Sequence, residues 1–286
     1  MKPSGWRRLT ADAGLRVRVA LVEAAARIKR ISESPRLDAE LLMAHALGVP
    51  RNRMLLVHLD DPVPDSFAAL VARRLQHEPV AHLTGLRGFW TIDLEVGPGA
   101  FIPRADTETL IEAAVAHFGD RAPATILDLG TGPGTLLLAA LDQWPAARGV
   151  GVEQSDVARG YALRNAARLG LSDRAEIVAG VWAQGIDARF DLVLTNPPYV
   201  ATSDPLPREV LDHDPAEALF GGPEGLDAYR VIIPDLPRLL SPGGIAVIEI
   251  GASQTDAVTA LVRAAGMQAD FRRDLGNRPR AVIAKP

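Results

Sequence analysis

Residues 126–134 read Ile-Leu-Asp-Leu-Gly-Thr-Gly-Pro-Gly, and they give the clearest indication of the fold. It begins as a largely apolar run typical of a buried strand, and three alternating glycines then lead directly into a helical pattern. Glycine at such a position lets the backbone turn sharply and approach a ligand closely. An ordinary strand-to-helix turn is the alternative, although packing alone gives no reason for glycine at every second position.

The same residues indicate what kind of ligand the loop holds. Their spacing differs from the dinucleotide fingerprint GxGxxG, because the glycines alternate and Asp128 precedes them. Pro133 lacks the N–H that would bind a pyrophosphate. A cationic sulfonium ligand does not need that N–H, and Asp128 would help to orient the ligand or balance its charge. We therefore expect a sulfonium cofactor.

Strand and helix patterns alternate from this region to the end of the chain. Strands are expected at 125–129, 149–153, 175–179, 190–195, 244–250, 268–272 and 280–284, and helices at 106–117, 134–143, 156–169, 226–240 and 254–265. Such alternation is typical of an α/β fold with a parallel sheet covered on both faces. Only residues 275–279 separate the last two strands, which is too short for a helical crossover, so these strands should pair antiparallel.

The N-terminal part of the chain has a different pattern. Helices are expected at 17–31, from Ser34-Pro35 to Gly48, and at 66–76. Residues 1–85 are therefore predicted to form a small all-helical domain, which docks a partner or covers a site. Residues 86–104 are expected to be a β-hairpin connection, with a strand at 89–96 and a turn at 97–99, and residues 105–286 the α/β domain.

Two further side chains follow the second and third predicted strands. Glu153 stands about twenty residues after the glycines, where a carboxylate can accept both ribose hydroxyls of a bound cofactor. A charge at a helix N-terminus, capped by Ser155, is the alternative. Trp182 could lie against an adenine ring or belong to the core. Parallel strands bring these residues to one edge of the sheet.

Residues 196–199, Asn-Pro-Pro-Tyr, follow the fourth predicted strand. Two prolines cannot continue a strand ladder, so the chain leaves the sheet at its carboxyl end, where α/β sheets bind ligands. Asn196 offers a donor and an acceptor, and its Oδ1 together with the Pro197 carbonyl could accept both N–H bonds of a planar –NH2 group. A plain Pro-Pro turn is the alternative.

Taken together, these motifs resemble the HemK/PrmC family of S-adenosylmethionine-dependent methyltransferases. Further matching segments are 34–42, 78–80, 89–90, 101–108 (Phe-Ile-Pro-Arg-Ala-Asp-Thr-Glu) and 217–222, so the resemblance runs from about residue 20 to the end. The chain departs from the family pattern where Ala105 replaces a proline, Glu153 an aspartate and Val181 an acid. The resemblance implies a Rossmann-like class I methyltransferase sheet.

The resemblance also implies a reaction and its residues. The enzyme would methylate the side-chain nitrogen (N5) of the GGQ glutamine in class I peptide chain release factors, with S-adenosyl-L-methionine as cofactor and no metal. The implied cofactor contacts are Gly130, Thr131, Gly132, Pro133, Gly134, Glu153, Trp182 and Asn196. The implied catalytic, substrate-binding residues are Asn196, Pro197, Pro198 and Tyr199.

Composition narrows the remaining alternatives. The chain has 286 residues, 48% hydrophobic residues, no cysteine and a net charge of −4. The lack of cysteine fits a reducing cytoplasm, and Arg7, Arg8, Arg16 and Arg18 precede no apolar spanning segment, so no membrane contact is expected. An adenine-N6 DNA or RNA methyltransferase could also use residues 196–199 on a flipped base, but the net charge disfavours direct nucleic-acid binding. A non-catalytic binding module is the other alternative.

Overall fold

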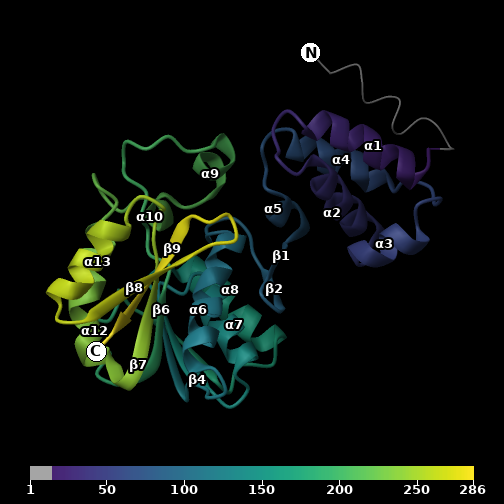
Figure 1. The fold of residues 1–286 in the computed structure, drawn as a ribbon. Helices are drawn as coiled ribbons and strands as arrows, with labels where there is room; N and C mark the ends of the chain where they lie inside the picture. Colours follow the sequence, from purple (N-terminus) through teal and green to yellow (C-terminus); the bar gives the residue numbers. More distant parts are fainter. Residues whose placement is uncertain (1–14) are drawn as a thin grey trace. The chain divides into compact units, whose positions relative to one another are not determined.

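The computed structural model describes residues 15–286, which form two compact units (Figure 1). The smaller unit comprises the chain up to Gly85 together with Arg208–His213, and the larger comprises Leu86–Pro207 and Asp214–Pro286. Arg7 and Arg8 lie outside the described residues. No helix within residues 15–286 is long and apolar enough to cross a membrane.

The smaller unit is helical. Its elements are α1 (Val17–Ile28), α2 (Pro35–Leu47), α3 (Arg51–Val57), α4 (Asp65–Arg74), α5 (Val80–Thr84) and α9 (Arg208–His213). Leu21, Met43 and Phe67 are buried in its core. Proline begins α2 and Gly48 ends it with φ 67°, as expected from the sequence. The Ser34 hydroxyl does not cap the backbone, because it hydrogen-bonds Asp38 Oδ1 at 3.3 Å.

The larger unit contains a seven-stranded sheet in the order β5-β4-β3-β6-β7-β9-β8. Its strands are β3 (Thr125–Leu129), β4 (Arg148–Glu153), β5 (Ala175–Ala179), β6 (Phe190–Thr195), β7 (Leu240–Glu249), β8 (Gln268–Arg273) and β9 (Pro279–Lys285). The first five pair parallel, whereas β9 pairs antiparallel with both β7 and β8. The predicted fold class, with its antiparallel last pair, is confirmed.

The hairpin before the sheet differs from the prediction. β1 (Leu86–Phe89) and β2 (Ile92–Glu95) are joined at Trp90-Thr91, so the expected single strand over 89–96 is wrong. The predicted turn at 97–99 is present, with Ala100 N donating to the Gly97 carbonyl at 3.3 Å, but it follows the hairpin and does not join its strands. Trp90 adopts φ 54°, a backbone conformation that favours glycine. Three hydrogen bonds hold this turn: Trp90 N to Glu108 Oε1, Trp90 Nε1 to Gln143 Oε1, and Thr91 Oγ1 to Asp142 Oδ2.

Helices cover both faces of the sheet (Figure 1). One face carries α6 (Glu108–Phe118), preceded by the short η2 (Ala105–Thr107), with α7 (Thr135–Gln143) and α8 (Asp156–Arg168). The other carries α11 (Asp227–Ile232), η3 (Ile233–Asp235), α12 (Leu236–Leu239) and α13 (Thr255–Ala264); α10 (Ala216–Leu219) lies in the preceding connection.

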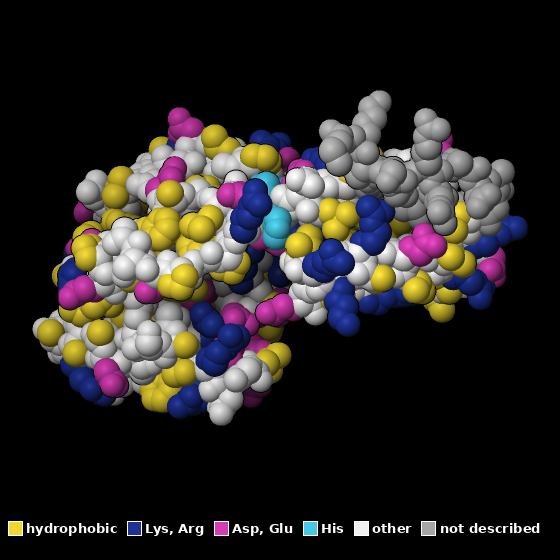
Figure 2. All heavy atoms as spheres, turned by 90° about the horizontal axis from the view of Figure 1, so that it is seen from above, with side chains coloured by type: hydrophobic (Ala, Val, Ile, Leu, Met, Phe, Trp, Pro, Cys, Tyr) yellow, Lys and Arg dark blue, Asp and Glu magenta, His cyan; other side chains and the backbone are white. Residues whose placement is uncertain are grey.

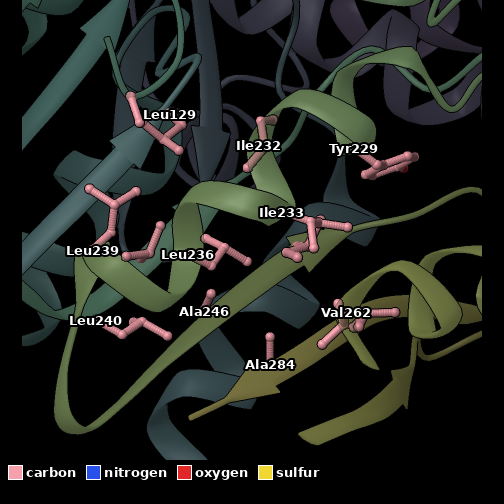
Figure 3. Packing of buried hydrophobic residues seen from close by; sticks show 14 of the residues in the cluster. Leu129, Tyr229, Ile232, Ile233, Leu236, Leu239, Leu240, Ala246, Val262 and Ala284 are labelled. Atoms are coloured by element: carbon pink, nitrogen blue, oxygen red, sulfur yellow. The ribbon is translucent and has the colours of Figure 1, made fainter. Parts of the chain in front are cut away.

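The second face holds an extensive apolar core cluster. Figure 3 shows Ile232, Ile233 and Leu236 packed with side chains of β7, β9 and α13. The single helix predicted over 226–240 is therefore wrong in detail, since it is divided into α11, η3 and α12. Pro234 and Pro237 have no backbone N–H to donate within a continuous helix, which accounts for the division.

Candidate active site

The crevice of the sheet lies between β3 and β6, which are neighbours although their following strands lie on opposite sides. Leu129 pairs with Thr195, and the Thr195 hydroxyl donates to the Leu129 carbonyl at 2.7 Å. Residues 130–134, the glycine loop, and residues 196–199, the amide loop, therefore leave the sheet side by side. In open α/β sheets this switch point is where ligands bind.

Asp128 supports the glycine loop from the protein interior, where its side chain is not accessible to a ligand. The residue is buried, and its Oδ2 accepts hydrogen bonds from Thr131 Oγ1 (2.6 Å) and Leu137 N (3.0 Å). Burial raises the pKa of Asp128 to about 7, against the effect of these two hydrogen bonds. The expectation that Asp128 orients a sulfonium directly is therefore replaced by a role in shaping the loop and the start of α7.

The glycine loop has an accessible part and a packed part. Gly132 has φ 58°, and a Cβ built on it would have no atom within 4 Å. By contrast, a Cβ on Gly134 would lie 2.6 Å from Leu138 Cδ1, so this glycine serves helix packing. Pro133 and Thr131 are also buried, and the Pro133 carbonyl accepts from Asn165 Nδ2 at 2.9 Å. Gly130 and Gly132 are the half-buried members that could contact a ligand.

Glu153 is fixed by the backbone around it. Its Oε2 accepts from Gly132 N and its Oε1 from Ser155 N, each at 2.8 Å. Ser155 also caps α8 by accepting from Ala158 N, as the helix N-terminus alternative predicted. A carboxylate has about four acceptor sites, so Glu153 retains capacity for further hydroxyl donors.

Trp182 lies directly over the glycine loop. Its Cζ3 atom would be 3.2 Å from a Cβ on Gly130, which explains why that position needs glycine. Trp182 has φ 50°, a strained conformation for a bulky side chain. The ring is half-buried and packs against the core cluster, as the packing alternative predicted, and part of it stays exposed.

Asn196 is half-buried, and its Nδ2 points to the Thr107 hydroxyl at 3.4 Å. Within residues 15–286, neither Asn196 Oδ1 nor the Pro197 carbonyl has a hydrogen-bond partner. These are the two acceptors that the sequence assigned to a planar –NH2 group. The amide loop therefore presents acceptor atoms, because its two side-chain donors, Asn196 Nδ2 and the Tyr199 hydroxyl, are directed to other protein groups.

The other end of the amide loop is packed against glycines. A Cβ on Gly221 would lie 2.4 Å from the Pro198 carbonyl oxygen, and one on Gly225 would lie 2.1 Å from the Tyr199 carbonyl oxygen. Gln254 Nε2 donates to that Tyr199 oxygen at 2.9 Å. This close approach holds the loop rigidly from outside.

Sequence reasoning missed the residues that support the loop. Thr107 was seen only within segment 101–108, and Glu249 only as the end of an apolar strand. An acid within the run 245–250 (Ile-Ala-Val-Ile-Glu-Ile) was the signal that could have identified it. Asp214 was also missed, although it is buried, accepts from Ile102 N at 3.2 Å and pairs with Arg104.

Charges of both signs lie on the face of the larger unit that is drawn in Figure 2, where Lys and Arg side chains stand beside Asp and Glu side chains. Duplex nucleic acid is attracted by a continuous positive field, and this part of the surface does not present one.

Comparison with known proteins gives consistent results for both units. The sequence profile of the PrmC N-terminal domain matches residues 20–85, and that of the methyltransferase small domain matches residues 105–211. A release factor glutamine methyltransferase from Caulobacter vibrioides is 40% identical over 258 residues, covering 88% of this chain and 89% of that protein. One from Mycolicibacterium smegmatis is 42% identical over 276 residues, covering 94% and 97%.

Solved structures share the fold of the larger unit. A methyltransferase from Pyrococcus furiosus has a TM-score of 0.51 at 18% identity, covering 74% of this chain and 95% of that one. The hMettl16 catalytic domain has a TM-score of 0.54 at 16% identity, covering 77% and 81%. At these identities the likeness shows the class I methyltransferase fold alone.

Proposed function

The chain belongs to the family of release factor glutamine methyltransferases, and we propose that it methylates the side-chain nitrogen (N5) of the GGQ glutamine in class I peptide chain release factors. The observation that carries this proposal is the pair of unpartnered acceptors, Asn196 Oδ1 and the Pro197 carbonyl, beside the glycine loop. Two acceptors match the two N–H bonds of a primary carboxamide.

The residues at the glycine loop fit S-adenosylmethionine. Space is open above Gly132, Glu153 keeps acceptor capacity for the ribose hydroxyls, and Trp182 offers a flat ring for adenine. Val181 precedes Trp182 and is exposed, so this chain offers no acid there to accept from the adenine amino group. When bound, S-adenosylmethionine supplies an electrophilic methyl group and a neutral thioether leaving group.

The protein's task is to orient a poor nucleophile. The nitrogen lone pair of a carboxamide is delocalised into the carbonyl group, and two acceptors on the N–H bonds fix the nitrogen and favour localisation of that pair. Such positioning contributes several powers of ten in rate. An alkylated amide nitrogen that still carries both protons is strongly acidic, so water can remove the proton after transfer without a side-chain base.

The partner and location follow from the same proposal. Class I release factors act on the ribosome, so we place the enzyme in the cytoplasm, in agreement with the absence of cysteine from the sequence. The helical unit, which matches the PrmC N-terminal domain, is the part we assign to holding the protein substrate.

The test is transfer of a labelled methyl group from S-adenosylmethionine to a purified class I release factor. A release factor whose GGQ glutamine is changed to alanine is the matched control, and duplex DNA is the competing substrate. We expect label only on the intact release factor, located by mass spectrometry on that glutamine. Label on adenine, or on the control protein at equal yield, contradicts the proposal.

A further inference from the structure

Glu249 is a buried carboxylate that the reaction described above does not use. It ends β7 beside the end of β6, since Thr195 pairs with Ile248 in these parallel strands. Only 1% of the residue is exposed. Its Oε1 accepts a hydrogen bond of 3.2 Å from the Tyr199 hydroxyl. Glu249 therefore reaches the last residue of the amide loop from the interior of the unit.

The same carboxylate is linked to the first residue of that loop. Asn196 Nδ2 lies 3.4 Å from Thr107 Oγ1. The Thr107 hydroxyl also interacts with the Glu249 carboxylate and lowers its pKa. Glu249 Oε2 has no hydrogen-bond partner within residues 15–286. Because a hydroxyl has a single proton, a Thr107 oxygen that accepts from Asn196 has that proton available for Glu249. One buried acid thus connects with both ends of residues 196–199.

The groups around Glu249 come from several elements. Arg280 of β9 and Asp106 of η2 act on it electrostatically, and the Tyr229 hydroxyl of α11 donates to its backbone carbonyl at 2.9 Å. Burial raises its pKa to about 7, although Thr107, Arg280 and Tyr199 lower it. Burial of a charge costs desolvation free energy, so we seek the contribution of Glu249 in the orientation of its neighbours.

We propose that Glu249 is a positioning residue, which acts through Thr107 to hold Asn196 with Nδ2 inward and Oδ1 toward the substrate amide, and through Tyr199 to fix the far end of the loop. This inference rests on the proposed function, because it assigns Oδ1 to the glutamine –NH2 group. Without these hydrogen bonds, Asn196 could present either Oδ1 or Nδ2 to the substrate. The hydrogen bonds through Thr107 favour the orientation with Oδ1 toward the substrate.

The direction of the hydrogen bonds from Asn196 through Thr107 to Glu249 depends on whether the Glu249 carboxyl group is protonated. The ionised carboxylate accepts from Thr107, so Thr107 must accept from Asn196 Nδ2. A protonated Glu249 can instead donate to Thr107, whose hydroxyl then donates to Asn196 Oδ1 and turns this acceptor away from the substrate. The ionised form is therefore the competent one, and turnover should fall as pH falls through about 7, the pKa of Glu249.

The test uses full-length variants with a release factor as substrate. Thr107→Val removes the hydroxyl at nearly constant shape, Thr107→Ser restores it, and Glu249→Gln removes the titration. Tyr229→Phe is the matched control, since it removes a neighbouring buried hydroxyl that hydrogen-bonds the Glu249 backbone carbonyl and Gln254. Within residues 15–286, that hydroxyl makes no hydrogen bond to the Glu249 carboxylate, Thr107 or Asn196. For each variant, kcat and KM are measured across the neutral pH range, and cofactor Kd is measured by calorimetry.

We expect Thr107→Val to lower kcat about tenfold with unchanged cofactor Kd, Thr107→Ser to recover most of it, and Glu249→Gln to lose the acidic fall in kcat. Tyr229→Phe should keep both kcat and its pH profile. Three results would each overturn this inference without affecting the proposed function. They are a wild-type kcat in Thr107→Val, a kcat of Glu249→Gln that still falls at acidic pH, and a loss of cofactor binding in proportion to the loss of kcat. Failure of the wild-type enzyme to methylate any release factor while it binds cofactor overturns the proposed function and this inference with it.

Discussion

Gly132 and Gly134 stand close together in one loop but meet different physical requirements. A side chain at Gly132 would enter open space, whereas one at Gly134 would collide with Leu138. We expect Gly132→Val to abolish S-adenosylmethionine binding at a cost of about 1–2 kcal/mol in stability, because its φ is positive. Gly134→Val should instead lower the melting temperature strongly. Calorimetric titration and thermal unfolding of both variants separate the two effects, and equal loss of cofactor binding and stability in Gly132→Val would contradict this division.

In the proposed function Asn196 recognises the substrate amide, so we expect its loss to be mainly a defect in rate. Asn196→Ala removes an acceptor aimed at the reacting group, and such a group contributes about 3–4 kcal/mol to transition-state stabilisation. The expected fall in kcat is about a hundred- to a thousandfold, with cofactor Kd nearly unchanged. Asn196→Asp keeps an acceptor oxygen but loses the Nδ2 donor to Thr107, so it should be partly active. Near wild-type turnover by Asn196→Ala would show that the reaction centre lies elsewhere.

The buried acid Asp128 should make stability fall as pH rises, the reverse of the usual behaviour of a carboxylate. Its pKa is raised from 3.8 to about 7 in the folded protein, so between these values the folded state holds a proton that the unfolded state releases. Asp128→Asn mimics the protonated form and does not titrate.

Relative to the wild type, Asp128→Asn should therefore gain about 2–3 kcal/mol between about pH 5 and pH 8. Urea unfolding at both pH values measures this difference. Asp120→Asn, at an exposed position, is the control and should show no such change. If the difference in stability between the two proteins were the same at both pH values, Asp128 would be ionised throughout this range in the folded protein, and the prediction would be wrong.

At the scale of elements, α2, α4 and α9 are joined by one buried arginine. Arg74 pairs with Asp38 at 2.9 Å and with Glu209 at 2.8 Å, and its side chain is 4% exposed. Removing one partner of such a buried group leaves uncompensated charge and costs about 3–5 kcal/mol. Arg74→Met should therefore destabilise the smaller unit by this amount in denaturant unfolding. Arg18→Met, which breaks an exposed pair with Asp60, should cost less than about 1 kcal/mol.

The elements also show what sequence patterns can and cannot predict. Buried strands such as β3 and β6 were placed from their apolar runs, because a parallel sheet buries both faces of a strand. The turn at Trp90 was missed, since its backbone conformation is imposed by Glu108 and Gln143, which are distant in sequence. Helix α3 was missed because Met54 is its single buried residue, so no amphipathic pattern exists.

The same distinction between local and long-range features applies to the residues of the candidate site. Motifs contiguous in sequence identified both loops, because glycine and proline spacing is visible locally. Thr107 and Glu249 contact the amide loop only after β6, β7 and η2 are brought together, so local spacing gave no sign of them. Long-range support of this kind depends on the fold and is not encoded in a short motif.

At the scale of the whole molecule, the two units should divide binding of the protein substrate from chemistry. The helical unit contributes none of the residues assigned to the cofactor or the amide, yet it matches the PrmC N-terminal domain over residues 20–85. Recognition of a large partner by a separate unit lowers KM without changing the chemical step. The full-length enzyme should therefore have a much lower KM for an intact release factor than for a short peptide containing the GGQ sequence.

Deleting residues 1–85 should remove most of this difference. The deletion leaves α9, which belongs to the smaller unit, without its partner helices, but it keeps every residue of the glycine and amide loops. We expect kcat/KM for the release factor to fall by about two orders of magnitude, as for loss of about 3 kcal/mol of binding energy. Turnover of the peptide and the cofactor Kd should change much less, because both depend on the larger unit. If peptide turnover and cofactor binding were lost to the same extent, the helical unit would be needed for folding of the larger unit and its assignment to substrate docking would be wrong.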